Sequence, residues 1–211
     1  KSELKKNFIE IGISGIWNDN NELELEDQSL TAQRSRSTYP VLMSKASYDV
    51  FNETLPGKRP WVISRSGGPG LQKYARTWSG DNMSDWESLK YNLYMGLGLG
   101  LSGIPYYGHD IGGFFGGHPD EKQFIRWCQS AVFQPRFVIH SWNEDGNPTE
   151  IWSYPNSQEI IRELVELHYC FMPLIYNTAI EASLTGIPME RPLALEFLKD
   201  EKLDPDSIHY L

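Results

Sequence analysis

Residues 11–22 read IGISGIWNDNNE, and this stretch decides how the rest of the chain is interpreted. It opens with apolar and small residues, which predict a strand over residues 11–19 that is covered on both faces. The polar run that follows would lie at the carboxyl end of this strand, where parallel α/β folds carry their catalytic and binding groups. A polar turn after a core strand is the simpler alternative.

Strand-type and helix-type segments alternate along the chain, which predicts an α/β fold with a parallel sheet. The helix at 85–101 should have its N-cap at Ser84 or Asp85, and the helix at 119–133 should carry Pro119 at its first position. The helix at 157–184 should bend or break near Pro173. Strands are expected at 11–19, 60–65, 104–110 and 137–140, helices at 2–10, 39–51, 85–101, 119–133 and 157–184, and loops at 23–38 and 66–80.

Four strands are fewer than a closed eight-stranded barrel needs. A flavodoxin-like open sheet would fit that count, although no phosphate-binding glycine motif opens a helix in this sequence. The chain begins Lys-Ser-Glu-Leu, with neither an initiator Met nor an apolar leader, and reaches a strand almost at once. We therefore expect it to be a piece of a longer polypeptide.

The composition argues against several classes of partner. The 211 residues are 40% hydrophobic and include 7 Trp and 11 Tyr, which is enough for a sizeable core in one domain. The formal net charge of −9 and the lack of a basic stripe argue against nucleic acid, whereas aromatic side chains suit stacking on a neutral sugar. The longest apolar stretch, 93–107, is interrupted by glycines and a proline, which argues against a membrane span.

Cys128 and Cys170 are far apart, without the spacing of a metal site. They are interpreted as buried free thiols, with a single disulfide as the alternative. The histidines are scattered and form no ligand cluster, so neither a metal nor an organic cofactor is expected. The sequence leaves the compartment and the formation of a homo-oligomer open, with the cytoplasm slightly favoured.

A second acidic residue, Asp81, lies in the segment WSGDN at 78–82, after the predicted strand that ends at Arg65. Taken alone, Asp81 is an acidic residue near the start of a helix. Three further segments have a composition typical of strand ends and loops: YGHDIGGF at 107–114, FQPRFVIH at 133–140 and TGIPMERPL at 185–193. In the first, two consecutive glycines predict unusual backbone angles.

Taken in order, these five segments resemble glycoside hydrolase family 31, the retaining α-glycosidases that include α-glucosidases and α-xylosidases. The resemblance covers nearly the whole chain. It implies a parallel (β/α)8 TIM-type barrel, of which this chain carries the later strands and helices. It also implies that residues 1–198 form part of a catalytic barrel. Residues 199–211 would then start the connection to a C-terminal β-sandwich.

The resemblance also assigns roles to particular residues. It implies that Asp19 is the nucleophile and Asp81 the general acid/base. Asn18, Asn20 and Asn21 could donate hydrogen bonds to Asp19, and Trp78 and Trp86 could flank Asp81; His109 is interpreted as structural. The substrate-binding residues implied by the family pattern are Trp17, Arg65, Trp78, Asp110, Phe114 and His140.

The sequence departs from the family pattern at three positions. Asn20 stands where Met is usual, Lys73 where Arg is common, and Val138 where an Arg usually precedes His140 by two residues. The substrate implied is an oligosaccharide or α-glycoside that is cleaved from its non-reducing end. Other domains of the same polypeptide are expected to act with this chain, and the departures from the pattern leave the identity of the sugar open. The alternatives are an α-transglycosylase, an α-N-acetylgalactosaminidase and a non-catalytic carbohydrate-binding fragment.

Overall fold

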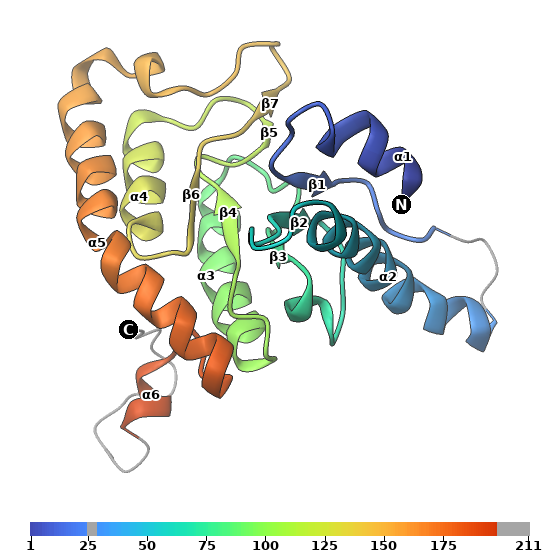
Figure 1. The fold of residues 1–211 in the computed structure, drawn as a ribbon. Helices are drawn as coiled ribbons and strands as arrows, with labels where there is room; N and C mark the ends of the chain where they lie inside the picture. Colours follow the sequence, from blue (N-terminus) through green and yellow to red (C-terminus); the bar gives the residue numbers. More distant parts are fainter. Residues whose placement is uncertain (25–28, 198–211) are drawn as a thin grey trace. The chain divides into compact units, whose positions relative to one another are not determined.

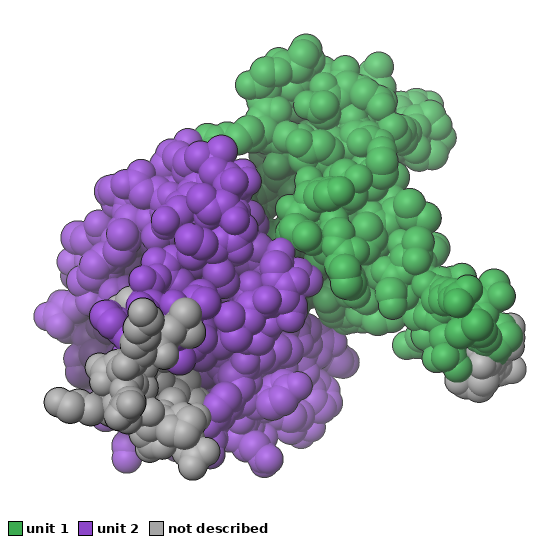
Figure 2. Space-filling model, turned by 90° about the horizontal axis from the view of Figure 1, so that it is seen from below, with its two compact units in different colours: residues 1–78 green, residues 79–211 purple. Residues whose placement is uncertain are grey.

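The computed structural model describes residues 1–24 and 29–197. Residues 199–211, predicted to start a connection to a β-sandwich, lie outside the described residues. The chain forms two compact units, Lys1–Trp78 and Ser79–Leu211 (Figure 2). Each unit combines short parallel strands with helices, as the alternating sequence pattern predicts (Figure 1).

The first unit is built on a three-stranded parallel sheet of order β1-β2-β3. Ile16 pairs with Val62, and Ile63 pairs with Arg76. A core formed by Ile9, Val50, Phe51, Val62, Leu71 and Ala75 lies beneath this sheet. The elements are α1 (Ser2–Leu4), the π-helix η1 (Lys5–Ile9), β1 (Ile16–Asn18), α2 (Leu30–Thr54), β2 (Val62–Ser64), the 3-10 helix η2 (Leu71–Lys73) and β3 (Arg76–Thr77).

Two predictions for the first unit were wrong in extent, and one strand was not predicted. The strand expected at 11–19 is paired only at Ile16–Asn18, because the residues before it form a turn after η1. The loop expected at 23–38 is largely helix, since α2 starts at Leu30, where the Ser29 hydroxyl accepts a hydrogen bond from the Ala32 amide. This half of α2 is polar and has no apolar period to reveal it. Strand β3 was missed because it is only two residues long.

The second unit contains two pairs of parallel strands, β4 with β6 and β5 with β7. Its core lies between these strands and the helices α4 and α5 and includes Ile111, Phe124, Trp127 and Ile161. The elements are α3 (Trp86–Leu101), β4 (Gly108–Asp110), β5 (Phe115–Gly116), α4 (Glu121–Ala131), β6 (Arg136–Val138), β7 (Trp142–Asn143), the 3-10 helices η3 (Ile151–Ser153) and η4 (Pro155–Ser157), α5 (Gln158–Thr185) and α6 (Leu193–Glu196).

The helix boundaries of the second unit follow from capping. Asp85 caps α3, as expected, by accepting a hydrogen bond from the Ser88 amide at 2.6 Å. Glu121, and not Pro119, is the first residue of α4, because Asp120 caps the helix by accepting a hydrogen bond from the Gln123 amide and leaves Pro119 just before the cap. Helix α5 continues through Pro173 without a break.

Among the described residues, no helix combines the length and the apolarity needed to cross a membrane.

Two glycines allow a close approach of backbone segments near β4. A Cβ on Gly108 would lie 2.4 Å from the Cβ of Arg136, which pairs with it on β6. Gly113 has φ of +82°, and a Cβ there would lie 2.5 Å from the Cα of Ser84. A larger residue at either position would therefore push neighbouring backbone apart.

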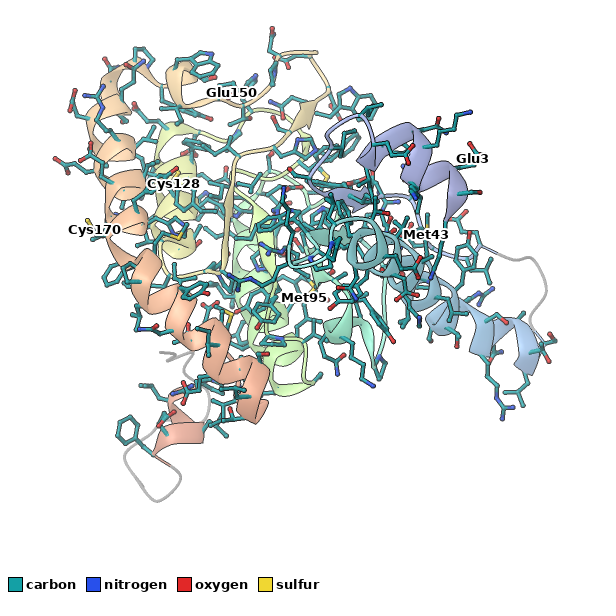
Figure 3. The ribbon with its side chains drawn as sticks, in the orientation of Figure 1. Glu3, Met43, Met95, Cys128, Glu150 and Cys170 are labelled. Atoms are coloured by element: carbon teal, nitrogen blue, oxygen red, sulfur yellow. The ribbon has the colours of Figure 1, made fainter. Side chains whose placement is uncertain are left out.

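The two cysteines occupy different environments. Cys128 is buried in the core of the second unit, and burial raises the pKa of its thiol to about 12. Cys170 is exposed and points outward from α5 (Figure 3). Both thiols are free, so the prediction of free cysteines is confirmed, but the prediction that both are buried is wrong for Cys170.

Glu190 generates a pH prediction for stability. Its carboxyl group is 4% exposed and accepts a hydrogen bond from the Tyr107 hydroxyl. Burial raises the pKa of Glu190 from 4.5 to about 7, and the Tyr107 hydrogen bond opposes the rise. The stability that this protonated carboxyl contributes is complete below about pH 4.5 and is lost as the pH rises through about 7, a change on the order of 3 kcal/mol.

We therefore expect Glu190→Gln, which keeps an acceptor for Tyr107, to flatten the pH dependence of the free energy of unfolding between about pH 4.5 and 7. Urea unfolding at several pH values measures this change. Glu166→Gln, at an exposed position on α5, is the matched control and should leave the pH dependence as it is. An identical pH dependence in wild type and Glu190→Gln would contradict the assignment.

Candidate active site

The predicted site residues gather at the carboxyl ends of parallel strands. In the first unit, Asp19 follows β1, Arg65 follows β2 and Trp78 follows β3 directly. In the second unit, Asp110 is the last residue of β4, and His140 comes two residues after β6. This is the edge at which parallel α/β folds place their functional groups.

In the first unit, Arg65 joins two acidic residues. Its guanidinium donates to both carboxylate oxygens of Glu22, at 2.9 and 2.8 Å, and its Nη1 lies 3.2 Å from Asp19 Oδ1. Arg65 lowers the pKa of Glu22 through these hydrogen bonds, so that Glu22 stays ionised and fixes the guanidinium in place. Asp19 is exposed, which leaves its carboxylate accessible to a ligand. The sequence pattern missed Glu22, although it closes the polar run after β1.

Asn20 is the residue that turns the chain between Asp19 and Glu22. Its φ is +48°, and it is the single non-glycine residue with positive φ in the described part of the chain. Asn tolerates this left-handed conformation better than most residues. Its side-chain oxygen also accepts from Arg65. The departure from the family pattern at Asn20 is therefore compatible with the backbone that this turn requires.

The asparagines around Asp19 do not all face it. Asn20 donates to the Asp19 carboxylate over 3.4 Å. Asn18 instead accepts from the Ser47 hydroxyl, and Asn21 donates to the Ser64 hydroxyl at 2.8 Å, both as buried side chains. The prediction that three amides donate to Asp19 is wrong, because two of them anchor the end of β1 to neighbouring elements.

Trp17 and Trp78 form an aromatic pair in the first unit. Their ring centroids are 4.6 Å apart with an interplanar angle of 60°. Trp78 is buried, whereas Trp17 is 43% exposed. The buried ring therefore supports the exposed one, which presents an apolar surface next to the polar run that begins at Asn18.

In the second unit, a buried ion pair joins β4 to β6. Arg136 donates from Nη2 to Asp110 Oδ1 and from Nη1 to the His109 carbonyl, each at 2.8 Å. The side chains of Asp110 and Arg136 are 0% and 5% exposed. Burial raises the pKa of Asp110, and the Arg136 guanidinium opposes that rise. The second oxygen, Asp110 Oδ2, is buried without a hydrogen-bond partner among the described residues, so it is an acceptor that this part of the chain leaves unsatisfied.

Arg136 was missed as a functional residue in the sequence. It stands 26 positions from Asp110 along the chain, and only the pairing of β4 with β6 brings the two together. Val138 occupies the position where the family pattern has an arginine. The charge that this chain lacks at position 138 is present two residues earlier, on Arg136 of the same strand.

The loop that carries Asp81 is attached to β4 and β5 by backbone hydrogen bonds. The Ser79 amide donates to the Gly108 carbonyl, and the Phe114 amide donates to the Asn82 carbonyl at 2.8 Å. Asp81 itself is exposed, and its charge acts on Asp110, whose pKa it raises. Asp81 and Asp110 therefore lie within electrostatic range of each other. Trp86, expected beside Asp81, is a helix residue that is 46% exposed.

Phe114 and His140 are also brought together in the second unit. Their ring centroids are 5.1 Å apart, and the charge of His140 lowers the pKa of Asp110. His109, by contrast, is 2% exposed, and burial lowers its pKa to about 3, so it stays neutral. This burial agrees with the structural role expected for His109. No group of three or more His, Cys, Asp or Glu residues that could hold a metal occurs in the described ranges 1–24 and 29–197.

The family model described as "Glycosyl hydrolases family 31 TIM-barrel domain" matches residues 1–178 of this chain. The chain belongs to glycoside hydrolase family 31. The parallel barrel class predicted for the sequence is thereby confirmed, and the parallel strand pairs of both units are those of a family 31 barrel domain.

The family 31 proteins that the chain resembles include alpha-glucosidases and alpha-xylosidases. The chain is 35% identical over 211 residues to "Alpha-glucosidase 2" of Bacillus thermoamyloliquefaciens, covering 92% of this chain and 26% of that protein. It is 32% identical over 217 residues to "Alpha-xylosidase" of Saccharolobus solfataricus, covering 94% and 29%. The crystal structure of a family 31 alpha-xylosidase from a soil metagenome, complexed with xylose, aligns with a TM-score of 0.86 and 28% identity over 95% of this chain and 34% of that one. The chain thus spans 26 to 34% of these relatives.

The buried pair generates a stability prediction. Arg136→Met would leave the Asp110 carboxylate buried without its cation, so we expect the free energy of unfolding to fall by about 3–5 kcal/mol. Arg126→Met is the matched control, because Arg126 is an exposed residue that donates to Gln129 on its own helix. The control should change stability by no more than about 0.5 kcal/mol. Chemical denaturation measures both values.

The double variant Asp110→Asn, Arg136→Met tests whether the loss comes from the unpaired charge. Removing both charges should recover part of the stability that Arg136→Met loses. If the double variant loses as much free energy of unfolding as Asp110→Asn and Arg136→Met lose together, Asp110 and Arg136 are not energetically coupled.

Proposed function

We propose that the polypeptide containing this chain hydrolyses terminal α-linked sugars from the non-reducing end of oligosaccharides or α-glycosides, with retention of configuration. One observation carries the proposal. Each unit presents an exposed carboxylate, Asp19 or Asp81, after a strand of a family 31 barrel domain, within a cluster of polar and aromatic side chains. Two carboxyl groups are what a retaining glycosidase needs at the scissile bond.

Asp19 acts as the nucleophile. Its carboxylate attacks the anomeric carbon while Asp81 donates a proton to the glycosidic oxygen, the carbon–oxygen bond breaks and the aglycone leaves as an alcohol. In the second step Asp81 takes a proton from water, the water oxygen attacks the anomeric carbon and the bond to Asp19 breaks. Two inversions restore the α configuration.

The remaining site residues hold the sugar. Arg65, fixed by Glu22, keeps the Asp19 carboxylate oriented through a contact of 3.2 Å. Asp110 accepts a sugar hydroxyl through Oδ2, since Oδ1 is already bound by Arg136. His140 hydrogen-bonds another hydroxyl.

Aromatic rings line the same site. Phe114 lies against the sugar ring, and Trp17 and Trp78 form the apolar wall on the side of Asp19. These rings pair with one another within each unit, so their apolar faces are positioned before a sugar binds.

The names of the relatives suggest two terminal sugars, glucose and xylose. The substrate is one of these, and nitrophenyl α-glucoside and α-xyloside distinguish them. A transglycosylase would give the same covalent intermediate but transfer the sugar to an alcohol, so the product with an added acceptor sugar is measured in parallel.

Variants of the full-length protein separate the two catalytic roles. Asp19→Ala should lower kcat by at least about 10³-fold on every substrate, because no covalent intermediate forms. Asp81→Ala should be as severe on a natural disaccharide, which has a poor leaving group. Nitrophenolate leaves without protonation, so the first step on nitrophenyl glycosides should survive in Asp81→Ala and the glycosyl-enzyme should accumulate as a burst.

Glu87→Ala is the control, because Glu87 is an exposed carboxylate on the first turn of α3 and belongs to neither catalytic group. It should keep the wild-type kcat. Normal turnover by Asp19→Ala would overturn the assignment of the nucleophile. Equal loss on good and poor leaving groups in Asp81→Ala would overturn the assignment of the acid.

A further inference from the structure

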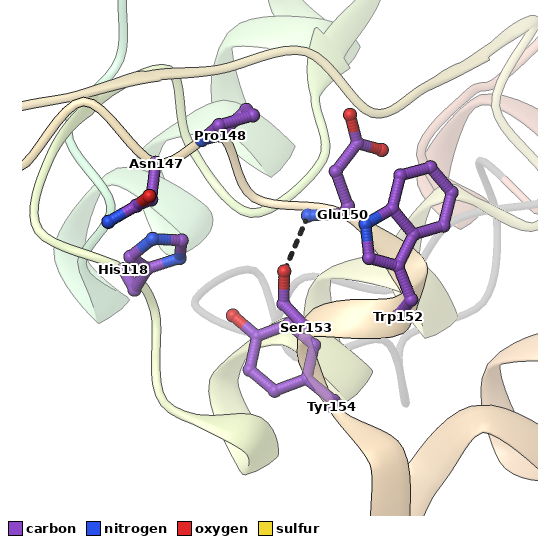
Figure 4. A pocket seen from close by; sticks show the side chains of 7 residues that line it. All are labelled: His118, Asn147, Pro148, Glu150, Trp152, Ser153 and Tyr154. Atoms are coloured by element: carbon purple, nitrogen blue, oxygen red, sulfur yellow. Dashed lines mark hydrogen bonds between the residues drawn. The ribbon is translucent and has the colours of Figure 1, made fainter.

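A second concave site lies in the second unit, after strands β5 and β7. It is a hollow of about 540 Å³, a volume within the range of small-molecule sites. We call it the Trp152 hollow (Figure 4). The described residues that line it are His118, Asn147, Pro148, Glu150, Trp152, Ser153 and Tyr154.

Trp152 supplies a flat apolar wall. Its side chain is 69% exposed, an unusual position for so large an aromatic ring. It belongs to η3, whose capping box is complete: the Glu150 carboxylate accepts from the Ser153 amide, and the Ser153 hydroxyl accepts from the Glu150 amide at 3.1 Å. The backbone that carries the indole ring is therefore fixed.

The base of the hollow is equally rigid. Tyr154 is 8% exposed, and its hydroxyl donates to the Pro119 carbonyl at 2.7 Å. Its ring stacks on Phe124 with centroids 4.7 Å apart and an interplanar angle of 21°. A preformed cavity loses less conformational entropy on binding than one that must be assembled.

Across the hollow from Trp152 stands His118 (Figure 4). The Asn143 amide nitrogen donates its two hydrogens to the Asn147 carbonyl at 2.7 Å and to the Thr149 hydroxyl at 2.9 Å. The Thr149 hydroxyl, 3.4 Å from His118 Nδ1, can then donate to Nδ1, an arrangement that places the ring proton on Nε2. Nε2 is 3.6 Å from an Asp145 oxygen, longer than a direct hydrogen bond. The Nε2–H group can therefore donate to a ligand hydroxyl.

The chemistry of the lining selects a neutral, hydroxylated ligand. None of the described residues that line the hollow is Lys or Arg. The nearby charges include the carboxylates of Glu150 and Asp145, and those of Asp120 and Glu121 act on Tyr154, so the surroundings disfavour an anion. Glu150 offers a carboxylate acceptor, His118 a donor and Trp152 a flat apolar face. A sugar ring matches this set, because it has an apolar face of C–H groups and an edge of hydroxyls that both donate and accept.

The Trp152 hollow is separate from the site residues of the second unit. Phe114 and His140 lie before β5 and β7, whereas His118 and Asn147 come after these strands. Because β5 and β7 run parallel, the residues before both strands lie at one end of the strand pair and the residues after both strands lie at the other end. Phe114 and His118 are four residues apart, which is at most roughly 13 Å of extended chain.

We propose that the Trp152 hollow is a second carbohydrate-binding site, which takes one neutral sugar residue of an α-glucan oligosaccharide. The sugar ring stacks on the indole of Trp152. Its hydroxyls donate to Glu150 and accept from His118. The choice of an α-glucan rests on the proposed function, whereas the binding itself uses none of the groups assigned to bond cleavage.

Calorimetric titration of the full-length protein with maltotriose and with isomaltotriose tests the proposal, with every variant made in an Asp19→Ala background so that the trisaccharides are not hydrolysed during the measurement. Trp152→Ala should remove one binding event per chain, or weaken it at least about tenfold. Trp152→Phe keeps a flat ring and should bind within about threefold of wild type. Glu150→Gln keeps an acceptor for the Ser153 amide and should weaken the same event by at least about threefold, which gives a second test should Trp152→Ala fail to fold.

Tyr169→Ala is the matched control, since Tyr169 is 68% exposed but lies on α5, away from the hollow. It should bind as wild type does. Trp152→Ala with unchanged stoichiometry and affinity for both trisaccharides would overturn the proposal. A Phe variant that folds but binds no better than the Ala variant would also overturn the stacking role.

The stoichiometry also separates this proposal from the catalytic one. If both hold, Trp152→Ala reduces two sugar sites to one. If only the Trp152 hollow binds sugar, the same variant reduces one site to none.

Discussion

The buried pair between Asp110 and Arg136 is the interaction on which the second unit depends. Two opposite charges that are almost completely removed from water are tolerated only with good geometry and further hydrogen bonds. Arg136 meets this condition by binding both a carboxylate oxygen and the carbonyl of His109. The pair therefore fixes the end of β4 against β6, and Gly108 provides the space that the arginine needs. The same contact leaves one oxygen of Asp110 unpaired and pointing at no described partner.

The first unit solves a related problem in a different way. Its arginine, Arg65, is partly exposed and is fixed by a bidentate contact with Glu22 instead of by burial. The first unit thus keeps the Asp19 carboxylate accessible to solvent beside the fixed guanidinium of Arg65. The second unit keeps the Asp110 carboxylate buried away from water. An accessible carboxylate can react, and a dry one can bind hydroxyls without competition from water.

The sequence predicted the strand ends better than the strand extents, for a physical reason. Polar residues after apolar runs mark the carboxyl ends of strands, so Asp19 and Asp110 were placed correctly relative to β1 and β4. The extent of pairing depends on neighbouring strands, which the local pattern does not contain, and a strand as short as β3, with two residues, leaves no pattern of its own. The first half of α2 was missed because its helix is secured by the Ser29 cap and not by an apolar period. Arg136 and Glu22 were missed because their importance lies in a partner distant in sequence or on another element.

The contrast between the two cysteines has a chemical consequence. A thiol reacts with alkylating reagents as its thiolate, and the raised pKa of Cys128 leaves almost none at neutral pH, while its burial excludes the reagent. Cys170 has no such shield in the described structure. Modification of the native chain should therefore stop at one adduct. If a second adduct forms slowly on Cys128, its rate measures how often the core around Trp127 opens. The fast adduct on Cys170 would serve as the internal reference.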